Sequence, residues 1–168
     1  MKLRTLSNER RNENAPGTYA LVLRAPRTIS IRVGRLGPLD VRRGYYVYVG
    51  SAFGPGGVAA RVGRHRSGAG RPRWHIDALR CVTRLVEVWI THDPIRREHD
   101  WAAAARGDLG GHVPLRGFGS SDCRCEAHLF RFPRRPSGEA FARCLAARHP
   151  GHAAVSVVVD SPRAAGDP

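Results

Sequence analysis

The sequence has few acidic residues and almost no lysine. It contains 28 basic and 14 acidic residues, which gives a formal net charge of +14, and Lys2 is its only lysine. A codon bias accounts for arginine in place of lysine, but not for basic residues that outnumber acidic ones two to one. A surface with this excess of positive charge attracts polyanions, and nucleic acid is the commonest of them. The charge therefore predicts a nucleic acid as partner.

Long apolar runs are also absent. No run approaches the ~20 residues that a membrane-spanning helix needs, which predicts a protein without membrane association. Residues 1–17, MKLRTLSNERRNENAPG, lack the apolar core of a secretory signal. Without such a signal, the four cysteines are expected to be free thiols in a reducing cytoplasm. We therefore expect a cytoplasmic protein.

A chain of 168 residues suits one domain with tails. Residues 1–15 are polar and charged, and we expect them to form a disordered tail. Residues 16–150 are expected to form the folded domain. Residues 151–168 are expected to be a C-terminal extension, in which 153–159, AAVSVVV, forms an edge strand before a final tail.

Periodic patterns predict an α/β fold, with a small, mainly antiparallel sheet flanked by helices. Alternating apolar residues predict strands at 17–25 and 29–34, joined by a turn at Pro26 into a hairpin. Residues 35–44 lack the pattern and are expected to be an irregular connection, and 107–127 a long loop. Further strands are predicted at 45–50, 83–91 and 128–132, and helices at 57–66, 73–80, 94–106 and 137–149.

The segment 44–66, GYYVYVGSAFGPGGVAARVGRHR, carries the clearest chemical signal. It combines a tyrosine-rich strand, a glycine turn and a helix in which Arg61 and His65 lie one turn apart. Arginine can hold two phosphoryl oxygens at once, and histidine and tyrosine are proton-transfer groups. The segment therefore predicts a phosphate site, which needs a carboxylate from elsewhere in the chain to bind a metal.

Several short motifs resemble those of the GIY-YIG nuclease superfamily. GTY at 17–19 and YVG at 48–50 are similar to its two signatures, and Arg61 with His65 fits its first helix. Glu98, at the end of VEVWITHDPIRRE, fits its metal-binding glutamate near a helix start.

The resemblance is closest to the Uri-like branch, a small domain also found fused to archaeal endonuclease III. Four further motifs carry it over about residues 16–132: YYVYVGSA, Arg64-His65, RWHID and FGSSDCRCEAHL.

The resemblance implies a divalent-metal-dependent endonuclease acting on nucleic acid, DNA more than RNA, in DNA repair. Glu98 would hold one Mg²⁺ or Mn²⁺ ion. Arg61 would stabilise the transition state, with Arg64 as a second phosphate-binding residue. Either Tyr19 or Tyr48 would help to deprotonate the attacking water, with His65 as relay. Five residues are expected around this site: Ser51, His75, Asp77, Asp122 and His128.

Two alternatives concern single residues. Glu87 is a rival to Glu98, but it lies in the middle of a strand between two valines. Cys123, Cys125 and His128 form a C-x-C-x-x-H cluster that contains zinc-ligand residue types. It lacks the usual cysteine spacing and a fourth ligand, so we expect no zinc and a polar loop held against the active site instead.

Two other function classes stay open. The domain could bind nucleic acid through its basic surface without cutting it. Alternatively, it could be a zinc-stabilised interaction module of a repair complex.

Overall fold

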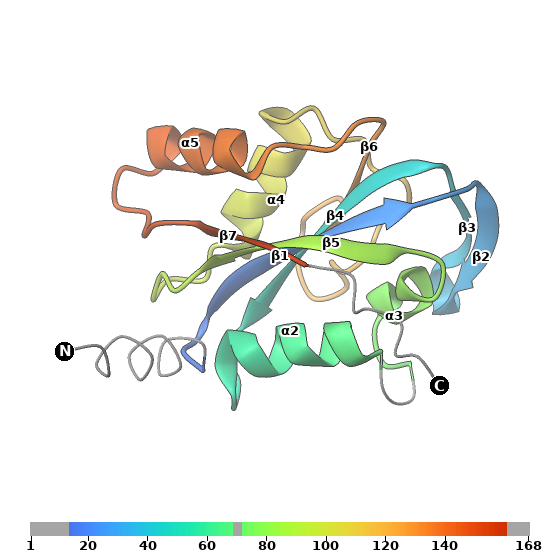
Figure 1. The fold of residues 1–168 in the computed structure, drawn as a ribbon, viewed down its shortest axis with the longest axis horizontal. Coiled ribbons are helices and arrows are strands. Elements are labelled where there is room, and N and C mark those ends of the chain that lie inside the picture. The colour runs from blue at the N-terminus through green and yellow to red at the C-terminus, as the bar shows by residue number, and fades with distance from the viewer. Residues whose placement is uncertain (1–13, 69–71, 161–168) are drawn as a thin grey trace, which may run out of the picture.

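A computed structural model describes residues 14–68 and 72–160 of the chain (Figure 1). The tails expected at residues 1–15 and after residue 160 therefore lie, apart from residues 14 and 15, outside the described residues. Within the described part, five strands form one sheet in the order β6-β4-β1-β5-β7, and all neighbours are antiparallel, which confirms the predicted sheet. The strands are β1 (Gly17–Ala25), β4 (Gly44–Ala52), β5 (Arg84–Thr91), β6 (Leu129–Phe132) and β7 (Ser156–Val159).

Helices cover both faces of this sheet (Figure 1). Central strand β1 serves both faces, because Tyr19, Leu21 and Leu23 enter one core while Ala20 and Val22 enter the other. The alternating side chains of β1 therefore point into two buried cores, one on each face of the sheet. The first core also takes side chains from α2 (Gly57–Ser67) and α3 (His75–Arg80), and the second from α4 (Glu98–Gly107) and α5 (Gly138–Arg148).

The hairpin predicted between the first two strands is wrong. β2 (Ile29–Val33) pairs instead with β3 (Gly37–Val41) in a separate two-stranded sheet, through the short 3-10 helix η1 (Gly34–Leu36). The expected irregular connection at 35–44 thus contains most of η1 and a strand. The sequence did not predict this strand because it contains Pro38. Proline is rare in strands, although the edge of a small sheet tolerates it.

Helix α4 begins at Glu98 rather than at the predicted residue 94. The buried carboxylate of Asp93 accepts a hydrogen bond from the Ile95 amide at 2.9 Å and pairs with the Arg97 guanidinium at 3.1 Å. Side-chain acceptors of this kind compete with helical hydrogen bonds, so the segment between Asp93 and Glu98 stays irregular. As a consequence, Glu98 lies in the first turn of its helix.

The predicted edge strand near the C-terminus is confirmed as β7, which pairs with β5 at the margin of the main sheet. The sheet thus extends past residue 150, where the folded domain was expected to end. Among residues 14–68 and 72–160, no helix combines the length and apolar character that crossing a bilayer requires.

Phe141 on α5 locks the second core. Its ring stacks on Trp89 of β5 with centroids 4.7 Å apart and meets Trp101 of α4 edge-on at 5.0 Å. The predicted N-cap of α5 is confirmed, because the Ser137 hydroxyl accepts a hydrogen bond from the Ala140 amide at 3.1 Å. Phe141 therefore joins α4, α5 and the sheet.

Replacement of this ring tests the packing. We expect Phe141→Ala to lower the free energy of unfolding by about 3–5 kcal/mol, because a fully buried aromatic ring is lost and a cavity remains. Ile95→Ala is the control, since Ile95 is 57% exposed, and should change it by less than about 0.5 kcal/mol. Chemical denaturation measures both, and equal effects would contradict the described core.

Candidate active site

Two tyrosines from neighbouring strands lie on the same face of the sheet. In the β1–β4 ladder, Tyr48 is opposite Leu21 and Gly50 is opposite Tyr19, so both phenols belong to the core under α2 and α3. Gly50 explains the glycine of the YVG motif. A Cβ atom at this position would lie 2.7 Å from the ring and hydroxyl of Tyr19, which crosses β4 here. Only glycine lets the phenol lie there.

Helix α2 brings His65 to this face. The Tyr19 hydroxyl and His65 Nε2 form a buried hydrogen bond of 2.9 Å, and the Tyr48 ring meets the imidazole edge-on at 6.3 Å. Burial lowers the pKa of His65 to about 4, and Asp77 offsets this only in part. The imidazole is therefore neutral at physiological pH and can accept the Tyr19 proton.

Burial acts on the two phenols in the opposite direction. It raises the pKa of Tyr48 to about 12 and the pKa of Tyr19 further above its usual range. The Glu98 carboxylate raises both values as well, whereas the Arg61 guanidinium lowers both. Both hydroxyls are therefore protonated at neutral pH, and Arg61 and Glu98 both lie near enough to act on them. We call Tyr19, Tyr48, Arg61 and His65 the tyrosine pocket.

The Trp74 ring packs against two of the three arginines of α2. The guanidinium groups of Arg61 and Arg64 lie 4.7 Å and 4.0 Å from the centre of its indole ring. Arg64 also pairs with the Asp77 carboxylate at 3.2 Å, whereas Arg61 has no carboxylate partner within the described residues. Arg61 is thus the better placed of the two to take a phosphate. The motif RWHID contained Trp74, but its stacking role depends on packing that the sequence does not display.

Glu98 lies at the start of α4, beside β1. The backbone N–H of Arg97 donates to the buried Thr18 hydroxyl at 3.1 Å, which ties this helix end to the residue before Tyr19. The Glu98 side chain is 17% exposed, and its nearest basic group is His99, at 3.9 Å. No arginine pairs with it in the described parts of the chain. In so basic a protein, a largely buried carboxylate without an arginine partner in the described residues fits a site for a hard cation.

The rival carboxylate, Glu87, has a structural role. It is 5% exposed, accepts a hydrogen bond from the Trp89 indole at 2.7 Å and pairs with Arg135 at 2.5 Å. Its ladder partner, Val22, belongs to the core under α4 and α5, on the opposite face from Tyr19. Glu87 therefore cannot serve the tyrosine pocket.

The residues expected around the site separate into different roles. His75 Nδ1 accepts a hydrogen bond from the Gly119 amide at 3.1 Å, so it anchors the long loop. Asp77 accepts from the Trp74 amide at 3.0 Å and holds Arg64, so it caps α3 and orients α2. Asp122 acts electrostatically on Tyr48. The other two are Ser51, opposite Thr18 in the ladder, and His128, in the cluster described next.

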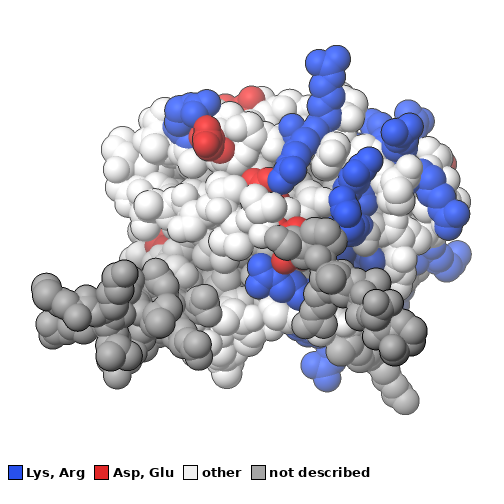
Figure 2. Space-filling model, viewed as in Figure 1, with Lys and Arg blue, Asp and Glu red and all other residues white. Residues whose placement is uncertain are grey.

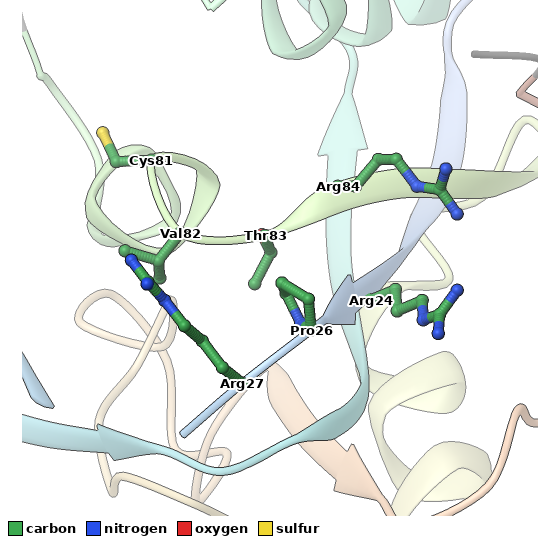
Figure 3. A pocket seen from close by; sticks show the side chains of 7 residues that line it. All are labelled: Arg24, Pro26, Arg27, Cys81, Val82, Thr83 and Arg84. Carbon is green, nitrogen blue, oxygen red and sulfur yellow. The ribbon is translucent and has the colours of Figure 1, made fainter. Parts of the chain in front are cut away.

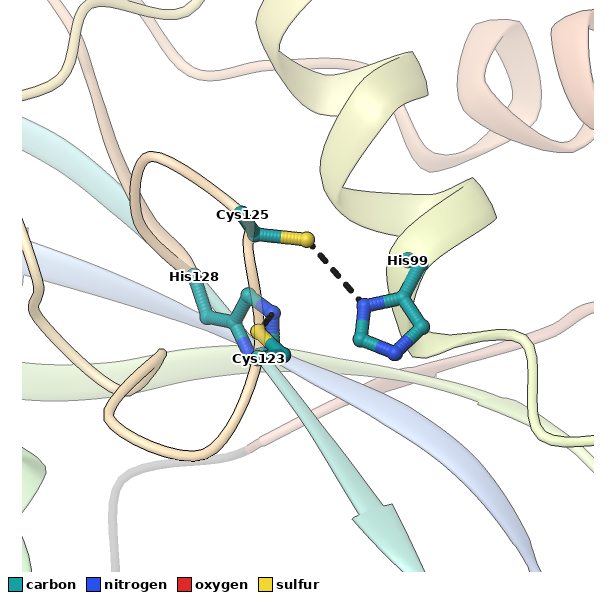
Figure 4. Close-up of side chains that lie close together, drawn as sticks. All are labelled: His99, Cys123, Cys125 and His128. Carbon is teal, nitrogen blue, oxygen red and sulfur yellow. Dashed lines mark hydrogen bonds between the residues drawn. The ribbon is translucent and has the colours of Figure 1, made fainter.

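Four possible metal ligands gather where the long loop meets α4 (Figure 4). Their ligand atoms lie within 4.8 Å of one another, and we call them the Cys/His cluster: His99, Cys123, Cys125 and His128. The C-x-C-x-x-H motif contains three of them and no fourth ligand. His99 escaped notice because only the fold brings the first turn of α4 to the loop.

A further pocket lies elsewhere in the molecule. It has a volume of about 670 Å³ and is lined by Arg24, Arg27 and Arg84 beside Pro26 and the 81–83 segment (Figure 3). Arg24 and Arg84 are opposite each other in the β1–β5 ladder, at the far end of β1 from Tyr19. Figure 2 shows that most arginines visible on this face gather in its right half, where Figure 1 shows β2, β3 and α3. This pocket is therefore part of a basic surface and not of the tyrosine pocket.

The fold and these residues define a small α/β domain with a tyrosine–histidine–arginine pocket beside a carboxylate that has no arginine partner in the described residues. The family model described as "Domain of unknown function DUF123" matches residues 18–149, from β1 through α5. The chain therefore belongs to this family, which is GIY-YIG-like. Searches of curated proteins and of solved structures gave no match.

Acidification tests the buried His65. Its folded-state pKa of about 4 lies below the ordinary value of 6.5, so the unfolded chain binds the extra proton first as pH falls. We expect wild type to lose about 2 kcal/mol of unfolding free energy between about pH 7 and 5 from this residue alone. The charged groups around it are Asp77, Arg61, Arg64 and Arg80, of which only Asp77 favours protonation.

The comparison is His65→Gln, which keeps a polar side chain but cannot titrate. Its unfolding free energy, measured by denaturation at each pH, should be flatter than that of wild type across this interval. Parallel curves would show that His65 is not held neutral in the folded protein.

Proposed function

We propose that this chain is a divalent-metal-dependent endonuclease of the Uri-like GIY-YIG branch, which hydrolyses phosphodiester bonds in DNA and acts in DNA repair. The main support is the buried 2.9 Å hydrogen bond between Tyr19 and a neutral His65. The positive charge of Arg61 lowers the pKa of the Tyr19 phenol, and the negative charge of Glu98 raises it. A proton acceptor, a phosphate-binding cation and a metal-binding carboxylate are the groups that this hydrolysis requires.

The proton path that these contacts favour runs through Tyr19. Its raised pKa keeps the phenol protonated, so a free phenolate is not the base. Instead, the Tyr19 oxygen takes a proton from the attacking water while its own proton passes to His65 Nε2. An incoming phosphate anion makes the imidazole more basic, which favours this transfer. Tyr48, whose ring is 6.3 Å from His65, orients the water or the phosphate.

Arg61 stabilises the charge that develops on the phosphate. Stacking on Trp74 fixes its guanidinium at 4.7 Å from the ring centre, and no carboxylate neutralises it within the described residues. Because the guanidinium is already oriented, little free energy is lost in positioning it when the phosphate binds. It therefore stabilises the additional negative charge of the transition state effectively. Arg64, held by Asp77, adds positive charge beside it.

Glu98 is the residue that fits a Mg²⁺ or Mn²⁺ ion, since its oxygen atoms are hard ligands without an arginine partner. When bound, the ion would stabilise negative charge on the leaving oxygen. The hydrogen bond from the Arg97 amide to Thr18 fixes the helix end, so the carboxylate stays beside the tyrosine pocket.

The basic surface favours a polymeric substrate. Arg24 lies five residues along β1 from Tyr19, about 17 Å at the rise of a strand, and Arg84 is opposite it on β5. A mononucleotide cannot contact both regions, whereas a nucleic-acid chain can. A net charge of +14 supports the same conclusion.

Cleavage of plasmid DNA tests the proposal. We expect wild type to nick supercoiled plasmid with Mg²⁺ or Mn²⁺, and Glu98→Gln and Tyr19→Phe to be at least about a hundredfold slower, because each removes a group that acts on the transition state. Glu139→Gln is the matched control, since Glu139 also lies in the first turn of a helix but is exposed. It should cut at the wild-type rate.

Two results would contradict the proposal in different ways. Cleavage by Glu98→Gln at the wild-type rate would remove the metal-binding role. If wild type binds DNA as tightly as Glu98→Gln does but cuts it with neither Mg²⁺ nor Mn²⁺, the domain is a non-catalytic nucleic-acid-binding domain.

Salt titration tests the basic surface separately. Each arginine–phosphate contact releases counterions, so affinity for duplex DNA should fall steeply as salt rises. With about six contacts, we expect a loss of about a thousandfold between roughly 50 and 200 mM salt, measured by fluorescence anisotropy. A flat dependence would contradict the inferred phosphate contacts.

A further inference from the structure

The Cys/His cluster joins two segments that are far apart in the sequence. His99 comes from the first turn of α4, whereas Cys123, Cys125 and His128 come from the last part of the long loop before β6 (Figure 4). The two cysteines are free thiols, and the cluster ranges from exposed at His99 to buried at His128. Two thiols and two imidazoles are the donor set of a zinc site.

We propose that His99, Cys123, Cys125 and His128 bind one Zn²⁺ ion in a closed, tetrahedral, structural site. Ligands bound at about 2.0–2.3 Å in a tetrahedron lie roughly 3.3–3.8 Å from one another. His99 Nδ1 lies 3.1 Å from Cys125 Sγ, and Cys123 Sγ lies 3.5 Å from His128 Nε2. Because no two ligand atoms are more than 4.8 Å apart, small side-chain rotations complete the geometry.

The orientation of His99 supports metal binding. Its Nδ1 faces the cluster, while its other ring nitrogen, Nε2, lies 3.9 Å from a carboxylate oxygen of Glu98. A histidine that ligates a metal usually gives its second N–H to a carboxylate or carbonyl, which fixes the tautomer that the metal needs. The 3.9 Å separation is longer than a hydrogen bond, so Glu98 favours this ring orientation by electrostatic attraction alone.

From residue 108 to residue 128 the loop contains no helix or strand of the described fold. An isolated β-bridge between His112 and Arg131 and the fully buried Phe118 ring hold parts of it, together with hydrogen bonds to neighbouring elements. Gly119 donates to His75 Nδ1 at 3.1 Å, and the Val49 amide donates to the His128 carbonyl at 2.9 Å. A metal with ligands on both sides would fasten the loop to α4, beside Tyr48 and Glu98.

Other occupants fit less well. Sulfur and imidazole ligands are soft or borderline donors, so Mg²⁺ and Mn²⁺ are disfavoured here and the site is distinct from the one proposed at Glu98. A disulfide between the cysteines would leave both histidines without a function in the cluster. Four ligands leave no open position, which makes the proposed role structural rather than catalytic.

Metal analysis of the purified full chain tests the site. We expect about one zinc per chain in wild type and none in the double variant Cys123→Ser/Cys125→Ser. The matched control is Cys81→Ser/Cys144→Ser, which also removes two cysteines but should keep the metal. Zinc that stays in the first variant, or leaves with the second, would overturn the assignment.

A second measurement covers the case in which the first variant fails to fold. Apoprotein prepared from wild type with a chelator should bind one Co²⁺ and acquire the visible absorption of tetrahedral thiolate coordination. His99→Gln should weaken that binding at least about tenfold. Wild type that is purified without zinc and takes up neither Zn²⁺ nor Co²⁺ would refute the proposal.

The outcome is separable from the nuclease proposal. Glu98→Gln keeps all four ligands, so it should still contain zinc although it no longer cuts DNA. A chain that contains zinc but has no nuclease activity would remove only the proposed function, whereas an active, zinc-free chain would remove only the zinc site.

Discussion

The hydrogen bond between Tyr19 and His65 determines how the tyrosine pocket is built. It joins the central strand β1 to α2 at 2.9 Å inside the core, where few polar groups are tolerated without a partner. Gly50 leaves the space that the phenol needs, and α2 carries Arg61 to the same place. Burial sets both protonation states, a neutral imidazole and a protonated phenol, and the proposed proton path depends on this pairing.

The first turn of α4 connects this pocket to the rest of the domain. Glu98 acts on both phenols, and the next residue, His99, belongs to the Cys/His cluster. Behind them, Trp101 packs edge-on against Phe141 in the second core. One helix end thus carries the proposed catalytic carboxylate, a proposed zinc ligand and a buried aromatic anchor, so a disturbance of any one of them affects the position of the other two.

Much of the fold could be predicted from the sequence, because β1 and β4 alternate clearly and α5 carries its own cap at Ser137. The errors have identifiable physical causes. Strand β3 was not predicted because it contains Pro38. Helix α4 begins later than predicted because the Asp93 carboxylate competes for backbone amides. Within the site, the motifs identified the chemically active residues, since their spacing reflects local structure. They could not identify His99 as a neighbour of Cys125, because that contact depends on how α4 packs against a distant loop.

The central claim is that one phosphodiester is bound between Arg61, the Tyr19–His65 pair and a metal ion on Glu98. The most direct measurement is a crystal structure of the protein with a short DNA oligonucleotide and Mn²⁺, located by its anomalous scattering. We expect a manganese peak at the Glu98 carboxylate, with a backbone phosphate between it and the Arg61 guanidinium. Manganese bound away from Glu98, or DNA that crosses the molecule without a phosphate near Tyr19, would contradict it.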